Sequence, residues 1–188
     1  MKRMWIIIIV SLVVGCAVAQ YNEYSSSGFK PDIGAKGIAG KVGMLYISTK
    51  DIGFTPGFGV WIDLGNLSPE IGLDAGLEYW NGSWEQSGGT LHKRDIAVYA
   101  TVKYEINMEK YNPFLGGGIG INMYKKTYPE GWSNPDETKN KLELHLDMGT
   151  VYSLNEKIDL EGRIKVNFSD FGTYGLYISA IFKTGQSQ

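Results

Sequence analysis

Eight segments of this chain alternate apolar and non-apolar residues with a period of two, which is the side-chain period of a β-strand. In the clearest segment, residues 159–168, Leu160 and Ile164 share one face while Glu161 and Arg163 share the other. An apolar face opposite a face dense in both signs of charge is typical of a strand with lipid on one side and a polar lumen on the other. The sequence therefore predicts an all-β fold, an eight-stranded antiparallel up-and-down transmembrane β-barrel.

The beginning of the chain has the pattern of a cleaved signal peptide. Lys2 and Arg3 precede an apolar run over 4–15, and small residues at 17–19 form a cleavage site before Gln20. The apolar run is shorter than the roughly 20 residues that a membrane-spanning helix needs. We expect a signal peptide over 1–19, a flexible periplasmic leader over 20–33 and the barrel over 34–188.

The only cysteine, Cys16, permits a second interpretation of this region. The run Val13-Val14-Gly15-Cys16 resembles a bacterial lipobox, in which the cysteine becomes the lipidated first residue. The cleavage pattern at 17–19 favours removal of Cys16 with the signal peptide. A mature chain without cysteine would have neither disulfides nor thiol chemistry. The near balance of 18 basic and 20 acidic residues argues against nucleic acid as a partner.

The alternation predicts strands of nine to thirteen residues, long enough to cross a membrane at a tilt. The expected strands cover 36–48, 56–64, 70–79, 95–106, 113–125, 141–152, 159–168 and 173–183. The polar links at 80–94 and 126–140 are expected to be the longest loops. With both termini in the periplasm, the longer links fall on the outside, as in outer-membrane barrels.

Three stretches resemble the small outer-membrane barrel family of the OmpA/OmpX type: residues 36–43, residues 113–120, and the hairpin from 147 to 163. The resemblance covers nearly all of the expected mature chain. It implies the outer membrane of a Gram-negative-type bacterium, with membrane lipid and the barrel-insertion machinery as partners and a monomeric state. The family usually ends on an aromatic residue, whereas here six residues follow Phe182.

The inward faces of the expected strands carry ionisable side chains. An eight-stranded barrel is just wide enough for side chains to fill its interior, so these groups are expected to form a paired, structural charge network. Its expected members are Lys41, Asp74, Lys103, Glu105, Glu143, His145, Asp147, Glu161, Arg163 and Lys165.

His145 lies between Glu143 and Asp147, which superficially suggests a metal or catalytic cluster. Residues two apart on a strand are about 6.6 Å apart, so metal ligation would need donors from neighbouring strands. No Gly-x-Ser-x-Gly motif is present in the chain, and no serine is next to a histidine in the sequence. We therefore expect no metal, no cofactor and no catalytic residue.

Aromatic residues near the strand ends are expected to form belts at the two membrane interfaces. The expected belt residues are Tyr46, Tyr79, Trp80, Tyr104, Tyr124 and Tyr152. Trp84 and Trp132 lie in the long polar links, and a sharper hypothesis makes them a contact patch for an extracellular ligand.

Three functions follow from these observations. The favoured one is a structural or surface-interaction barrel with a charge-filled lumen. The first alternative is a narrow channel for ions or small solutes. The second is a soluble, lipocalin-like barrel that binds an apolar ligand, in which Leu160 and Ile164 would be inside and Glu161 and Arg163 would meet water.

Overall fold

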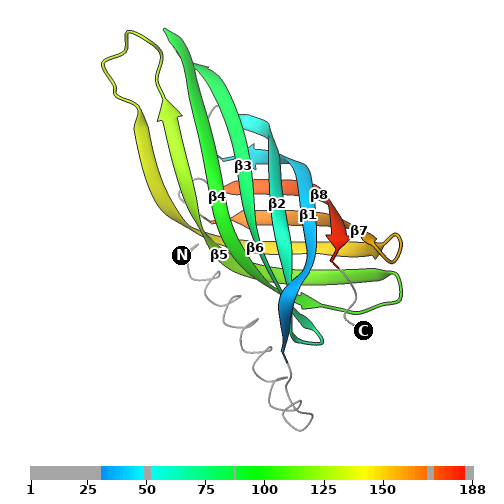
Figure 1. Ribbon diagram of the computed structural model, residues 1–188. Helices are drawn as coiled ribbons and strands as arrows, with labels where there is room; N and C mark the ends of the chain where they lie inside the picture. The colour runs from blue at the N-terminus through cyan, green and yellow to red at the C-terminus, as the bar shows by residue number, and fades with distance from the viewer. Residues whose placement is uncertain (1–30, 49–51, 87, 169–171, 185–188) are drawn as a thin grey trace, which may run out of the picture. The chain divides into compact units, whose positions relative to one another are not determined.

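The computed structural model describes residues 31–48, 52–86, 88–168 and 172–184. These residues form eight antiparallel strands in one closed barrel, in which β1 pairs with both β2 and β8 (Figure 1). The strands are β1 (Asp32–Ile47), β2 (Gly53–Ser68), β3 (Ile71–Gln86), β4 (Gly89–Glu105), β5 (Tyr111–Thr127), β6 (Glu137–Ser153), β7 (Ile158–Asn167) and β8 (Thr173–Lys183). The fold predicted from the sequence is confirmed.

Several expectations fall outside the described residues. The signal peptide over 1–19, with Cys16, and the leader up to residue 30 are among them. The end of the predicted leader is wrong, because residues 32 and 33 already belong to β1. In the described part of the chain, no helix is long and apolar enough to cross a membrane.

Side chains along each strand alternate between an exposed apolar face and a buried face. On β4, Val98 and Val102 are exposed, whereas Tyr99, Thr101 and Lys103 are buried. The exposed hydrophobic side chains thus form a band around the barrel, which we call the apolar belt. A charge on such a surface would cost about 2–4 kcal/mol at the centre of a bilayer, which explains why the charged residues of these segments turn inward.

The orientation of the faces excludes the lipocalin-like alternative. Leu160 and Ile164 are 39% and 46% exposed, whereas Glu161 and Arg163 are each 1% exposed. A soluble barrel with an apolar binding cavity requires the reverse arrangement. This interior instead holds charged side chains.

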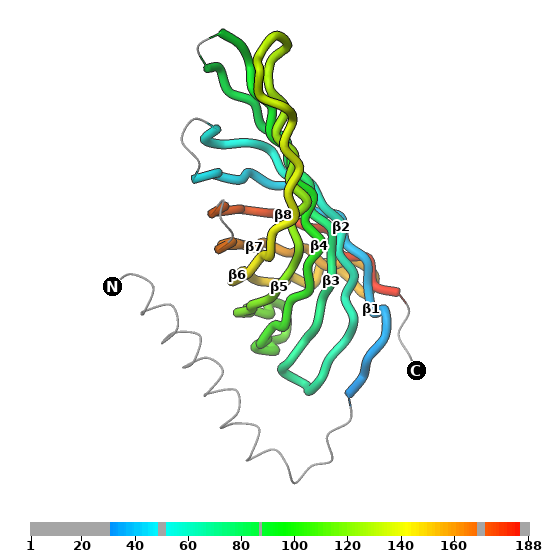
Figure 2. The backbone as a smooth tube through the Cα atoms, turned by 90° about the vertical axis from the view of Figure 1, so that its left-hand side faces the viewer, coloured from blue at the N-terminus to red at the C-terminus, as the bar shows by residue number. Residues whose placement is uncertain are grey.

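Two hairpins extend beyond the rest of the barrel wall (Figure 2). The predicted loop over 80–94 is mostly strand, because β3 continues to Gln86 and β4 begins at Gly89. The predicted loop over 126–140 is shorter as well, since β6 begins at Glu137. We call the end of the barrel with these hairpins the hairpin end. The opposite end, where β1 begins and β8 ends, is the termini end.

Candidate functional site

Arg163 is the centre of an ion network in the half of the lumen near the termini end. Its guanidinium donates to Glu161 through Nε and Nη2, both at 2.9 Å. It also contacts Asp74 at 2.8 Å and Asp147 at 3.1 Å. The rings of Trp61 and Phe114 each lie 5.2 Å from the guanidinium carbon. Arginine suits this position because its five donors lie in one plane and its faces stack on aromatic rings.

Lys103 extends this network toward the termini end. Its Nζ lies 3.6 Å from Asp74 Oδ2 and 3.0 Å from Glu105 Oε1. Glu105 is the least buried expected network residue, with a side chain 21% exposed. The network therefore reaches solvent on this side through a paired carboxylate.

Glu78 is the centre of a second ion network, nearer the hairpin end. Lys41 Nζ lies 2.7 Å from Glu78 Oε2, and Lys165 Nζ lies 3.3 Å from the same oxygen. Tyr177 donates a short hydrogen bond to the other Glu78 oxygen. Lys165 also pairs with Glu143 at 2.6 Å. Cations and carboxylates from β1, β3, β6 and β7 thus meet across the lumen.

Glu78 and Tyr177 were missing from the predicted network, although the signal for Glu78 was present. Glu78 has the same parity on β3 as Asp74, so period-two alternation places both inside. Tyr177 alternates with the exposed Leu176 and Ile178 and could have been found in the same way. The ten predicted residues all lie within the lumen, with Glu105 at its edge.

His145 takes part in an array that resembles a hydrolytic triad in its order. Its Nδ1 lies 3.0 Å from Glu143 Oε1, and its Nε2 lies 2.9 Å from the Thr101 hydroxyl oxygen. In a hydrolytic triad, a hydroxyl nucleophile contacts a histidine base, and an acid contacts the other ring nitrogen of that histidine. However, Thr101, Glu143 and His145 are 1%, 0% and 3% exposed, so a substrate has no route to the hydroxyl. This geometry cross-links β4 and β6.

A glycine on β5 makes room for this histidine. A Cβ at Gly118 would lie 2.5 Å from His145 Nε2 and would also clash with the Ala100 carbonyl oxygen. Gly118 pairs directly with His145 in the β5–β6 register. The glycine run at 116–120 is therefore closely packed barrel wall. Among the described residues, no group of His, Cys, Asp and Glu could hold a metal ion.

Apolar clusters lie on both sides of the ion networks. Leu45, Ile47, Trp80 and Tyr177 form one at the hairpin end, with Ile52 packed against it. At the termini end, a second cluster consists of Ala39, Trp61, Ile181 and Val151.

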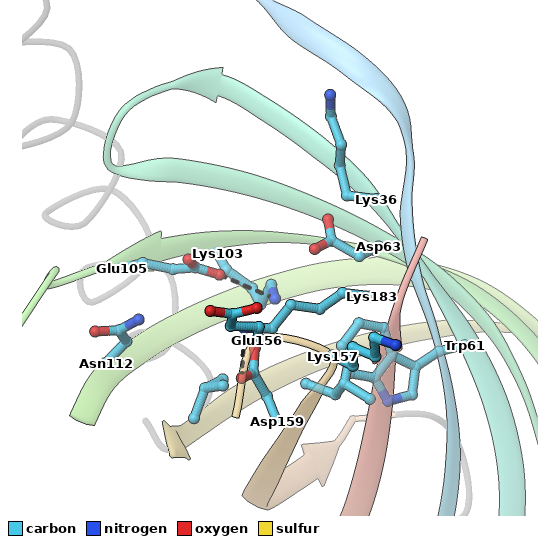
Figure 3. A pocket seen from close by; sticks show the side chains of 12 residues that line it. Lys36, Trp61, Asp63, Lys103, Glu105, Asn112, Glu156, Lys157, Asp159 and Lys183 are labelled. Atoms are coloured by element: carbon cyan, nitrogen blue, oxygen red, sulfur yellow. Dashed lines mark ion pairs between the residues drawn. The ribbon is translucent and has the colours of Figure 1, made fainter. Parts of the chain in front are cut away.

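A vestibule of about 450 Å³ lies at the termini end. Trp61, Val151 and Ile181 are among its lining residues, and they belong to the apolar cluster just described. Charged side chains surround its mouth, including the pairs Lys103–Glu105 and Lys183–Asp159 (Figure 3). The vestibule thus borders a cluster that closes over the network of Arg163.

The residues expected in the aromatic belts do not all lie on the outer face of the wall. Tyr46, Tyr79 and Tyr104 are 43%, 40% and 42% exposed on the outer face of the wall. Tyr152 is half-buried, and its ring lies 5.0 Å from that of Tyr111.

Trp80 and Tyr124 contradict the prediction, because they are 3% and 4% exposed and point inward. Each directly follows an outward residue, Tyr79 or Met123, so alternation turns it inward as long as the strand continues. For Trp80, the predicted strand 70–79 ends one residue too early. Tyr124 lies within the predicted strand 113–125, so the alternation itself turns it inward and its outward assignment ignored that pattern.

The two tryptophans of the predicted contact patch belong to different hairpins. Lys126 Nζ lies 5.8 Å from the Trp84 ring and 4.4 Å from the Tyr128 ring. The Tyr128 and Trp132 rings are 6.3 Å apart. A Cβ at Gly88 would lie 3.6 Å from Trp132 Nε1, so this indole lies against the tip of the β3–β4 hairpin. We call Trp84, Lys126, Tyr128 and Trp132 the hairpin patch.

Ion pairs support the loop that carries Trp132. Lys125 pairs with Asp136 at 3.1 Å, and Asp136 also accepts a hydrogen bond from the Tyr128 amide. The hydrogen bond from Lys125 lowers the pKa of Asp136. Hydrogen bonds from Lys139 and the Tyr128 hydroxyl lower the pKa of Glu137 in the same way. These contacts tie both sides of the loop together.

The model of the outer membrane protein beta-barrel domain family matches residues 8–184. The chain belongs to this family. It is therefore an integral β-barrel protein of the outer membrane, as its resemblance to small outer-membrane barrels implied.

Solved structures of small outer-membrane barrels are similar to this chain in fold. Neisserial surface protein A has a TM-score of 0.59 and 14% identity, over 79% of this chain and 96% of its own. A major outer membrane protein from Thermus thermophilus has a TM-score of 0.57 and 14% identity, over 80% of this chain and 100% of its own. Ail, the attachment invasion locus protein of Yersinia pestis, has a TM-score of 0.54 and 12% identity, over 80% of this chain and 98% of its own. Among curated proteins, none matches the chain.

Proposed function

We propose that this protein is a sealed outer-membrane barrel whose role is to present the hairpin patch to an extracellular ligand. The observation that carries the proposal is the contrast between the lumen of the barrel and its hairpin end. The lumen is occupied by buried ion pairs between two apolar clusters, which favours a stable support over a conduit. At the hairpin end, aromatic rings and a lysine from two hairpins lie close together beyond the apolar belt.

The chemistry of the patch favours a ligand with a flat or polyhydroxylated face and negative charge. Half-exposed indole and phenol rings supply large, rigid contact surfaces, and Lys126 supplies a cation between them. The similar barrel Ail has been crystallised in complex with the heparin analogue sucrose octasulfate. A sulfated sugar is therefore a reasonable first probe for this chain.

Titration calorimetry with sucrose octasulfate tests the proposal on the folded protein in nanodiscs. Trp84→Ala combined with Trp132→Ala should abolish measurable binding. Phe54→Ala combined with Tyr174→Ala removes two exposed aromatics of the apolar belt and should leave binding unchanged. Equal binding by both double variants and the wild type would exclude the hairpin patch as the contact surface.

We also propose that the barrel is monomeric and that the mature chain begins at Gln20. Closure of β1 on β8 supports the first point, because it leaves no open strand edge at that seam for a second copy to cover. β8 presents Leu176, Ile178 and Phe182 outward, an apolar face suited to the insertion machinery. Mass spectrometry of the mature N-terminus distinguishes cleavage before Gln20 from lipidation at Cys16.

A further inference from the structure

A groove lies on the outer surface of the wall, on the side away from the lumen. It has a volume of about 280 Å³ and crosses β3, β4 and β5. Tyr79, Asn81, His92, Arg94, Lys125 and Thr127 line it, with a contribution from Lys93. Among the described residues, none of those lining the groove is acidic.

The groove begins where the apolar belt ends. On β4 the outward residue changes from Ile96, 41% exposed, to Arg94. On β5 it changes from Met123, 39% exposed, to Lys125. Because this end of the barrel carries the longer hairpins, the change marks the outer surface of the membrane. The groove therefore opens sideways at the depth of the lipid headgroups.

Two cations of the groove lie directly opposite each other on neighbouring strands. Arg94 and Lys125 are directly paired residues of β4 and β5 on the same outward face. Like charges in this position repel. Asp136 lies 3.1 Å from Lys125, while Arg94 has no ion pair among the described residues. Asp136 thus offsets the charge of Lys125, and an anion in the groove would supply the ion-pair partner that Arg94 does not have among the described residues.

We infer that this groove binds a phosphate-bearing headgroup of an outer-leaflet lipid. The Arg94 guanidinium can donate two parallel hydrogen bonds to phosphate oxygens, and Lys125 adds a second charge. Asn81 and Thr127 place further polar groups at the groove. The acyl chains of such a lipid would lie along the adjoining apolar belt, which a soluble anion cannot use.

Native mass spectrometry of the folded full-length protein in detergent tests the inference. The probes are lipid A with its phosphates and the same lipid after dephosphorylation. The phosphorylated lipid should be retained more tightly by the wild type. Arg94→Gln combined with Lys125→Gln should weaken that retention by about tenfold or more and leave the dephosphorylated lipid unaffected.

The control removes the same charge elsewhere. Lys110→Gln combined with Lys157→Gln alters two exposed lysines at the termini end and should retain the lipid as the wild type does. Equal wild-type affinity for the two lipids would overturn the inference, and this comparison needs no variant to fold. Equal losses in the two double variants would also overturn it. Displacement of the lipid by excess inorganic phosphate would assign the groove to a soluble anion instead.

Discussion

Arg163 compensates three buried carboxylates, so its removal should be the most damaging single change in the lumen. Replacing one partner of a buried ion pair leaves the others charged in a medium that solvates them poorly, at a cost of about 3–5 kcal/mol. Arg163→Met should therefore lower the free energy of unfolding by about this amount. Urea unfolding in lipid vesicles, followed by tryptophan fluorescence, measures it.

Arg94→Met is the matched control, since Arg94 is exposed and has no ion pair among the described residues. It should change the free energy of unfolding by less than about 1 kcal/mol. Similar unfolding midpoints for the two variants would show that the network around Arg163 contributes little to stability.

Gly118 tests the packing of His145 against the wall. Gly118→Ala places a methyl group against His145 Nε2 and the Ala100 carbonyl, and should destabilise the barrel by about 1–3 kcal/mol. Gly162→Ala is the control, because a Cβ there meets nothing within 4 Å. If both variants unfold at the same urea concentration, His145 does not pack closely against β5 at Gly118.

For individual side chains, the sequence predicts the direction in which a side chain points better than the residue with which it pairs. Parity alone placed Arg163, Asp74 and Asp147 inside, but they come from three strands, and only the closed register brings them together. The error at Trp80 came from a misplaced strand end, whereas Tyr124 lies within the predicted strand and its outward assignment ignored the alternation.

The β3–β4 and β5–β6 hairpins show why strand ends were harder to predict than strands. Inside the membrane, lipid requires apolar outward residues, and the alternation is visible in the sequence. Beyond the apolar belt the outward residues no longer face the hydrocarbon of the bilayer, so His92 and Arg94 replace the aliphatic side chains. Backbone pairing continues to Gln86 and Gly89 without that signal. A polar segment between two strands was therefore mistaken for a loop.

The β5–β6 hairpin should respond to acid through Asp136. The pKa of this carboxyl is below the ordinary value of 3.8, mainly because of the hydrogen bond from Lys125. Because the pKa of Asp136 is lower in the folded state than in the unfolded state, the ionised carboxyl stabilises the hairpin at pH values above the unfolded-state pKa. This stabilisation is lost as the pH falls through the folded-state pKa. In an NMR titration, the Tyr128 amide resonance should shift with a midpoint below 3.8.

Lys125→Gln should move that midpoint upward, toward the value of an unpaired aspartate. Lys139→Gln removes a nearby lysine that pairs with Glu137 instead, and should leave the midpoint in place. A midpoint that is unchanged in Lys125→Gln would show that the pair with Asp136 does not hold the loop in solution.

The whole molecule combines a closed ring of strands with an interior of paired charges. The closed ring gives each strand two neighbours within the barrel wall, and the apolar belt matches the lipid, so class and location could be predicted from the sequence. The ligand could not be predicted, because the hairpin patch proposed to contact it combines residues of two hairpins, and the contact between these hairpins depends on how their loops pack. Trp84 and Trp132 were nevertheless proposed as partners from their positions in polar links.

Conductance across planar bilayers tests most directly whether the lumen is sealed. The purified, folded barrel should give no steady current, because the ion networks of Arg163 and Glu78 and the two apolar clusters occupy the path. A reproducible open conductance that scales with salt concentration in the wild-type protein would contradict this account.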